Sequence, residues 1–228
     1  QGSMSTALGH YALAAQNFTS ATNVYNVAVG HNAGAAVTTG TTNTFVGGLA
    51  GSVNTTGASN TAVGMQSLAS NTTGNYNSVL GKYALLYNST GANNVAVGYS
   101  SLFANTTASN NTAVGTSALA ANTTGATNTA VGANALDANT TASSSVAVGH
   151  NAATANTTGA NNVAVGKDSL ETNTTGAGNT AIGKDALQNN TTASNNTAVG
   201  MDALTANTTG IDNVAVGSGA LDSNTTAN

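Results

Sequence analysis

The chain of 228 residues has a formal net charge of −4, with only 4% charged and 4% aromatic residues and no proline, cysteine or tryptophan. So few large apolar side chains exclude a thick globular core, the absence of cysteine excludes a disulfide scaffold, and the composition is not that of a disordered chain. Three lysines without an arginine argue against a nucleic-acid partner, and no apolar run approaches the roughly 18 residues of a membrane span, so we expect no membrane insertion in this segment.

The beginning of the chain differs from the rest. Gln1-Gly2-Ser3 is typical of the remnant of a cleaved expression tag, so we assign residues 1–4 to such a remnant. Gly9 ends the first copy of a phrase that recurs throughout the chain, and the next copy ends at Gly30, farther along than the later spacing would place it. We therefore predict an irregular N-terminal repeat over residues 5–29, with a four-residue insertion.

From residue 30 to residue 228 the same phrase returns with a constant period of 17, as from Gly30 to Gly47, and its glycine closes the letters Ala-Val-Gly or a close variant. A short fixed period indicates a solenoid, in which each unit buries its apolar groups by stacking on its neighbours. We therefore predict an all-β fold, a parallel β-solenoid of about thirteen 17-residue coils. The predicted structural glycines are Gly30, Gly47, Gly64, Gly81, Gly98, Gly115, Gly132, Gly149, Gly166, Gly183, Gly200 and Gly217.

The residues before each glycine predict a short strand, as at residues 94–98. Alternate residues of a strand point to opposite faces. We predict that Val95 and Val97, with their equivalents, fill the interior of the coil, and that Ala96 faces outward. A row of exposed alanines is unusual for a strand in water, so this row predicts a second chain packed against it.

After the glycine come two variable residues, a small residue and then leucine in nearly every unit. The residue before the small one is often Asp, Ser or Asn, which are typical of helix caps and Asx turns. Each coil is therefore expected to have room for one short helical turn. A longer helix is excluded, because a helix is about 10 Å wide and stacked strands repeat about every 4.8 Å.

The Asn-Thr-Thr phrase predicts a structural ladder, because asparagines at equivalent positions of stacked coils can bond amide to amide. A second asparagine row runs from Asn60 to Asn213 and is broken by Ser145. Between the rows one position alternates Gly and Ala, which predicts a need for smallness; the strand-end glycine is the better candidate for positive φ or close backbone approach. The first row comprises Asn54, Asn71, Asn88, Asn105, Asn122, Asn139, Asn156, Asn173, Asn190, Asn207 and Asn224.

The stretch "NNVAVGYSSLFANTTASNNTAVGTSALAANTTG" resembles the head repeats of trimeric autotransporter adhesins, the YadA-like group, and related repeats of phage tail fibres. The resemblance extends over residues 5–228. It implies a left-handed β-roll, three identical chains side by side, and an extracellular location on a bacterial cell surface or a phage virion. It also implies a role in attachment to a host surface, with a receptor or glycan of unknown identity as partner.

Residues that could carry chemistry are few. The position after the glycine holds His10, His31 and His150, but it holds Lys, Tyr, Thr, Met or Ala in other units, so we expect no metal site. A column of aspartates stands beside lysines, which favours charge balance between coils over a cation site. These residues are Asp168, Asp185 and Asp202, with Lys167 and Lys184. We expect no catalytic residue and no cofactor, and hence no enzyme.

The functional expectation is a non-enzymatic fibre or adhesin segment that presents or contributes to host attachment. Tyr83 and Tyr99 leave two alternatives open, an aromatic patch for glycan contact or packing at the seam between chains. The alternative function is an ice-binding solenoid that uses stacked Thr and Asn rows. Against it, adjacent threonines such as Thr123 and Thr124 should point to opposite faces, whereas a flat two-row array would prefer Thr-x-Thr.

Overall fold

The computed structural model describes residues 4–16 and 23–227, so most of the predicted tag remnant and the centre of the predicted insertion lie outside the described residues. The described residues form strands and turns and no helix. The chain divides into two compact units, Gln1–Asn111 and Thr112–Asn228, each of which is a parallel β-solenoid.

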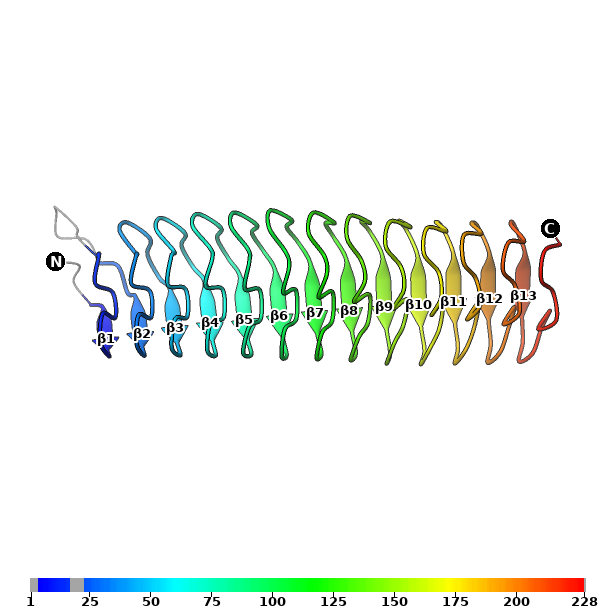
Figure 1. Cartoon of the computed structure of the whole chain (residues 1–228), viewed down its shortest axis with the longest axis horizontal. Helices are drawn as coiled ribbons and strands as arrows, with labels where there is room; N and C mark the ends of the chain where they lie inside the picture. Colours follow the sequence, from blue (N-terminus) through cyan, green and yellow to red (C-terminus); the bar gives the residue numbers. More distant parts are fainter. Residues whose placement is uncertain (1–3, 17–22, 228) are drawn as a thin grey trace. The chain divides into compact units, whose positions relative to one another are not determined.

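The described residues of the first unit form six strands of three residues, which lie side by side in chain order (Figure 1). They are β1 (Thr6–Leu8), β2 (Val27–Val29), β3 (Thr44–Val46), β4 (Thr61–Val63), β5 (Ser78–Leu80) and β6 (Val95–Val97). Each strand pairs with the next in parallel. Thr6 pairs with Val27 across the predicted insertion, whereas from β2 onward each residue pairs with the one that lies a single regular repeat later, as Val27 does with Thr44.

In the part of the second unit that the structure describes, the same arrangement is repeated with seven strands. They are β7 (Thr112–Val114), β8 (Thr129–Val131), β9 (Val146–Val148), β10 (Val163–Val165), β11 (Thr180–Ile182), β12 (Thr197–Val199) and β13 (Val214–Val216). All pair in parallel with a shift of a single regular repeat. One coil thus equals one sequence repeat in both units.

The interior of the coil is lined by the central residue of each strand, and the predicted strand faces were therefore assigned the wrong way round. Ala62 is fully buried, whereas Thr61 and Val63 on either side of it are exposed or half-buried. The reason is the thinness of the coil: the fully buried Leu68 reaches across the interior, so the strand opposite has room only for a small side chain. Alanine is thus a core residue, and its row is no evidence for a second chain.

One coil shows how this space is shared. The centre of β3 is Phe45, which is fully buried where other strands have Ala or Val. The leucine position is glycine in its own coil and in the coil before it: a Cβ on Gly51 would lie 2.5 Å from the Phe45 ring, and a Cβ on Gly34 would lie 2.8 Å from it. A large side chain on the strand thus occupies the volume that two leucines fill elsewhere.

The segment after each glycine is an irregular turn, so the predicted helical turn is wrong. In the coil of β4, Gln66 (φ 55°) and Leu68 (φ 52°) have left-handed backbone. The Gln66 N–H donates to the carbonyl of Gly48 in the preceding coil (2.9 Å), and the Leu68 N–H donates to Ala84 in the following coil (3.0 Å). A helix would satisfy these groups within one coil, whereas here they join neighbours. In other coils the position of Gln66 holds Asp, Asn or Ser and also has left-handed backbone, a conformation in which Asn and Asp are enriched.

Candidate functional site

The first asparagine row forms the expected amide ladder in each unit. Asn71 donates one amide hydrogen to Oδ1 of Asn54 in the preceding coil (2.7 Å) and the other to the carbonyl of Gly74 (3.0 Å). Both contacts recur along the row, which is fully buried from Asn54 to Asn207. Asn224 departs from the prediction: it is partly exposed, donates to the carbonyl of Ala227 (3.2 Å), and leaves Oδ1 of Asn207 without a partner. These amides are used by the fold and are closed to a ligand.

The second asparagine row joins side chain to main chain. Oδ1 of Asn60 accepts from the backbone N–H of Asn77 (3.0 Å), and Nδ2 of Asn60 donates to the carbonyl of Gly74 (2.9 Å). At the break in the row, the hydroxyl of Ser145 accepts from the N–H of Asn162 (3.3 Å) and so replaces an amide oxygen. This row is also structural.

The strand-end glycines have φ between 126° and 141° at all twelve predicted positions. At Gly64, an added Cβ would lie 2.5 Å from the carbonyl oxygen of Gly81 in the next coil. Both the backbone conformation and the close approach exclude a side chain. At the Gly/Ala position between the asparagine rows, Gly74 does not have a positive φ. A Cβ added to Gly74 would nevertheless lie equally near a carbonyl of the next coil, so this position requires only a small residue.

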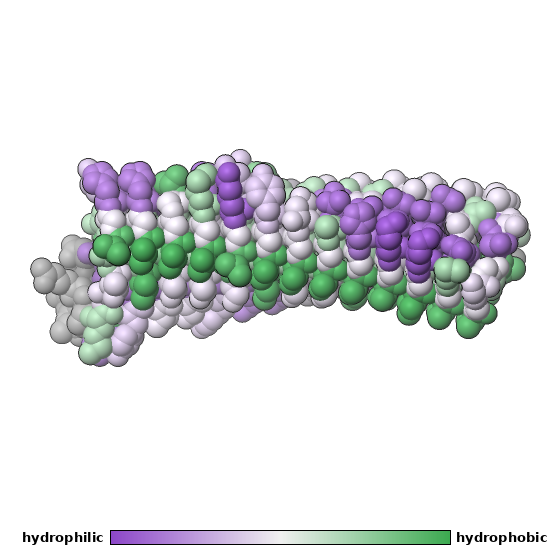
Figure 2. Space-filling model, turned by 90° about the horizontal axis from the view of Figure 1, so that it is seen from below, coloured by the Kyte–Doolittle hydropathy of each residue, from purple (hydrophilic) through white to green (hydrophobic). Residues whose placement is uncertain are grey.

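The outer face of the strands carries two rows of side chains in each unit. The first residue of each strand is Thr, Val or Ser, and the third is always Val, Leu or Ile. We call the row of third residues the aliphatic row; it comprises Leu8, Val29, Val46, Val63, Leu80 and Val97 in the first unit and Val114, Val131, Val148, Val165, Ile182, Val199 and Val216 in the second. Figure 2 shows apolar side chains in a row along each unit. Ile182 is 39% exposed and Leu80 is 52% exposed, so the row is open to water.

The paired threonines do not form a flat double row. The hydroxyl of the first threonine donates along the stack, as from Thr55 to the carbonyl of Thr72 (2.9 Å). The second threonine, such as Thr56, is exposed at a corner of the coil. The asparagine rows are buried, so of these stacked rows only the threonines reach the surface.

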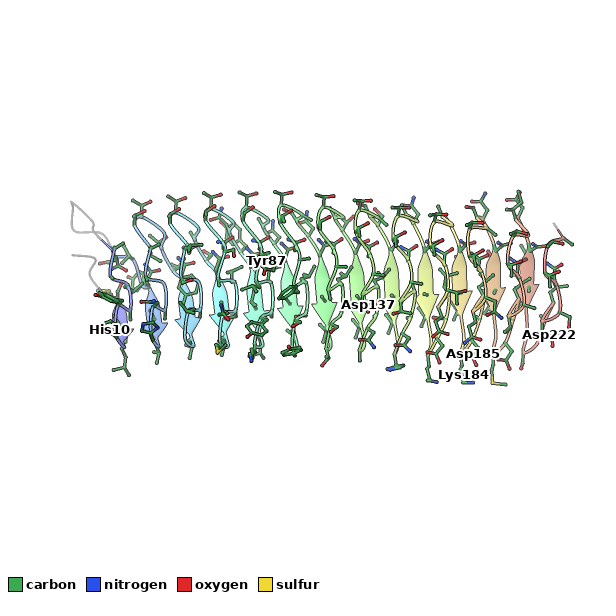
Figure 3. The ribbon with its side chains drawn as sticks, in the orientation of Figure 1. His10, Tyr87, Asp137, Lys184, Asp185 and Asp222 are labelled. Carbon is green, nitrogen blue, oxygen red and sulfur yellow. The ribbon has the colours of Figure 1, made fainter. Side chains whose placement is uncertain are left out.

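Charged side chains gather on the second unit, where Figure 2 shows the largest hydrophilic patch. Lys167 pairs with Asp168 (2.7 Å) and Lys184 with Asp185 (2.6 Å), as Figure 3 shows for the second pair. The pairs lie within one coil and not between coils as predicted. Asp168 has a side chain only 12% exposed and also accepts from Asn151 (3.1 Å); the hydrogen bond from Lys167 is the main cause of its lowered pKa.

The histidines do not form a ligand set. The rings of His10 and His31 stack with centroids 5.6 Å apart, and Nδ1 of His150 lies 3.8 Å from Asp168. Over residues 4–16 and 23–227, no three His, Cys, Asp or Glu side chains are grouped so that they could hold a metal ion.

Aromatic side chains gather on the turns of the β5 and β6 coils in the first unit. The rings of Tyr83 and Tyr99 meet edge to face with centroids 6.0 Å apart, and those of Tyr87 and Phe103 do so at 5.0 Å. Nζ of Lys82 lies 4.6 Å from the centroid of Tyr83. Tyr87 projects from the coil of β5 in Figure 3. Tyr83 and Tyr99 were candidates from the sequence, whereas Lys82 was not, although the sequence has no acidic residue near Lys82 that could pair with it.

No protein-family model matches the chain, and no curated protein is similar to it. In the part of the chain that the structure describes, no helix has the length and hydropathy needed to cross a membrane. The resemblance to adhesin heads and tail fibres therefore stays a prediction.

Proposed function

We propose that this chain is a non-enzymatic segment of an extracellular fibre or adhesin, in which identical chains, three by the resemblance, pack through their outer strand faces. The segment would extend from a bacterial cell or a virion and contribute to attachment. The observation that carries this proposal is the aliphatic row, because its position is Val, Leu or Ile in every strand and never polar.

The exposure of the aliphatic row favours its burial against another protein surface. Strands that face water usually alternate apolar and polar residues, and each Å² of apolar surface removed from water contributes about 25 cal/mol. The structure repeats this row at every coil, so one packed contact would recur at every coil of two chains laid in parallel. A second copy has the same row with the same spacing and fits it without any further adaptation.

The rest of the coil supports a role as a shaft. Both asparagine rows are buried and hydrogen-bonded, and the strand-end glycines bring neighbouring coils into backbone contact. Such a coil holds its shape without a thick core and can vary its turn residues freely. Variable turns on a constant scaffold are suited to presentation of surface contacts.

The test is the mass in solution, measured by light scattering after size-exclusion chromatography. We expect three times the 21.9 kDa chain. Val148→Lys with Ile182→Lys should lower the mass, since it places charges on the aliphatic row; Thr158→Lys, at an exposed corner of the coil, is the matched control and should not. A wild-type mass of 21.9 kDa would refute packing through this face.

A second candidate function is ice binding by the outer face of the strands, instead of by the Thr and Asn rows. The outer face of the strands presents Thr, Val or Ser in the first row, as at Thr129 and Thr180, and the aliphatic row beside it. The spacing along a strand is about 6.7 Å and between strands about 4.8 Å. Both candidates use the same face, so a trimer leaves no free array. A monomer that lowers the freezing point below the melting point, and loses this activity in Thr129→Tyr, would favour ice binding.

A further inference from the structure

Lys82 is the only charged side chain of the first unit other than histidine, because residues 1–111 contain no other lysine, no arginine and no carboxylate. The other two lysines occupy the same position after the strand-end glycine, and each pairs with the aspartate that follows it, at 2.7 Å and 2.6 Å. In the coil of Lys82 the following residue is Tyr83. The ammonium group of Lys82 thus lies over the ring of Tyr83, and its unit has no carboxylate to neutralise it.

The aromatic cluster beside Lys82 is not required by the fold. The positions of Tyr83, Tyr99, Tyr87 and Phe103 hold Ser117, Thr116, Ala121 and Ala120 in the first coil of the second unit. That unit has no aromatic residue and forms the same parallel coils. Tyr87 and Tyr99 are each about half exposed. Four rings on two neighbouring coils therefore add apolar surface without a role in packing the interior, which is typical of a binding surface.

We propose that Lys82, Tyr83 and Tyr99 bind a carboxylate-bearing sugar ring of an acidic polysaccharide. The apolar C–H face of a pyranose can lie on an exposed tyrosine ring, whose hydroxyl remains available for sugar hydroxyls. The carboxylate of the sugar supplies the counter-charge that the aspartates supply for the other two lysines. The inference rests on the proposed attachment function and names the class of its ligand.

The test uses the full chain and two probes, a trimer of galacturonic acid and the uncharged maltotriose, with binding measured by calorimetry. We expect the acidic probe to bind and to weaken with added salt, and maltotriose to bind at least about tenfold more weakly. Lys82→Met, which takes the residue of the preceding coil at Met65, and Tyr99→Thr should each weaken binding about tenfold. Tyr83→Asp should do the same, because it recreates the ion pair of Lys167. Lys184→Met is the matched control and should bind as the wild type does.

Three outcomes would overturn the inference. They are no binding of either probe, equal binding of both probes, or binding that Lys82→Met leaves unchanged. The masses of the same samples distinguish this inference from the proposed assembly. A monomer that binds galacturonate would support the sugar site and refute packing of the chains into a fibre. A Tyr99→Thr variant of lower mass, in a protein that binds no sugar, would assign the cluster to a contact between chains.

Discussion

Replacement of one ladder asparagine, Asn190→Ala, tests whether the buried amides hold the coils together. Asn190 donates to Oδ1 of Asn173 (2.9 Å) and to the carbonyl of Ala193 (3.0 Å), and its own Oδ1 accepts from Asn207 (3.2 Å). Alanine removes all three hydrogen bonds. The Ala193 carbonyl keeps its hydrogen bond from Asn179 (2.9 Å), so one buried acceptor, Oδ1 of Asn173, and one buried N–H of Asn207 are left without these partners. At about 1–2 kcal/mol for each of these two groups, we expect a loss of roughly 2–4 kcal/mol in the free energy of unfolding.

The assay is urea denaturation followed by circular dichroism, with Asn224→Ala as the control. The side chain of Asn224 is partly exposed and donates to the carbonyl of Ala227, so the control should lose less than about 1 kcal/mol. Hydrogen exchange at the amides of the neighbouring coils should accelerate in Asn190→Ala alone. Equal stability of the two variants would refute the argument that the ladder stabilises the stack.

Three further predictions concern other parts of the coil. Gly132→Ala should lower the unfolding free energy by more than about 2 kcal/mol in urea denaturation, because φ is 138° and the new Cβ would meet a carbonyl oxygen of the next coil at 2.3 Å. Phe45→Ala should cost about 3–5 kcal/mol in the same assay, and the added change Gly51→Leu should restore part of it by filling the cavity. The pKa of Asp168 is lowered in the folded chain, so its contribution is present above the unfolded value of about 3.9 and disappears as the pH falls through the folded value. Lys167→Met should therefore melt at a lower temperature than the wild type at pH 7, and this difference should shrink as the pH is lowered below about 3.9.

The period, the positions of the glycines and the two asparagine rows were predictable from the sequence because stacking repeats one environment at every coil. Gly64 and its equivalents never vary, since they meet the backbone of the next coil, and the buried asparagines recur with a single break at Ser145 in the second row. Positions that hold the same residue in every repeat therefore indicate where neighbouring coils contact each other.

The orientation of the strand was not predictable by the same means. Alternation divides residues such as Val95, Ala96 and Val97 into two sets, and the usual rule places the larger set inside. In this coil Leu102 already fills the interior, so the smaller residue lies inside. One coil of the sequence does indicate the orientation. Phe45 at the centre of a strand occurs together with glycine at two leucine positions, which is expected only if the strand centre and the leucine share the same interior.

The turns were missed because their residues have two uses. Asp, Asn and Ser cap helices, but they also accept left-handed backbone, and the sequence does not distinguish these uses. Leu68 in the left-handed region was not foreseeable from propensity at all. Its conformational cost of about 1–2 kcal/mol is offset by full burial of the side chain.

The ladder of the first asparagine row has a direction. In each unit the amides of the row donate toward the coil that precedes them, as from Asn71 to Asn54. A chain leaving the ribosome completes its early coils first, and each completed coil presents an oxygen acceptor to the donor of the coil that emerges next. The stack can therefore grow by one coil at a time, in the order of synthesis, with every new asparagine meeting a partner already in place.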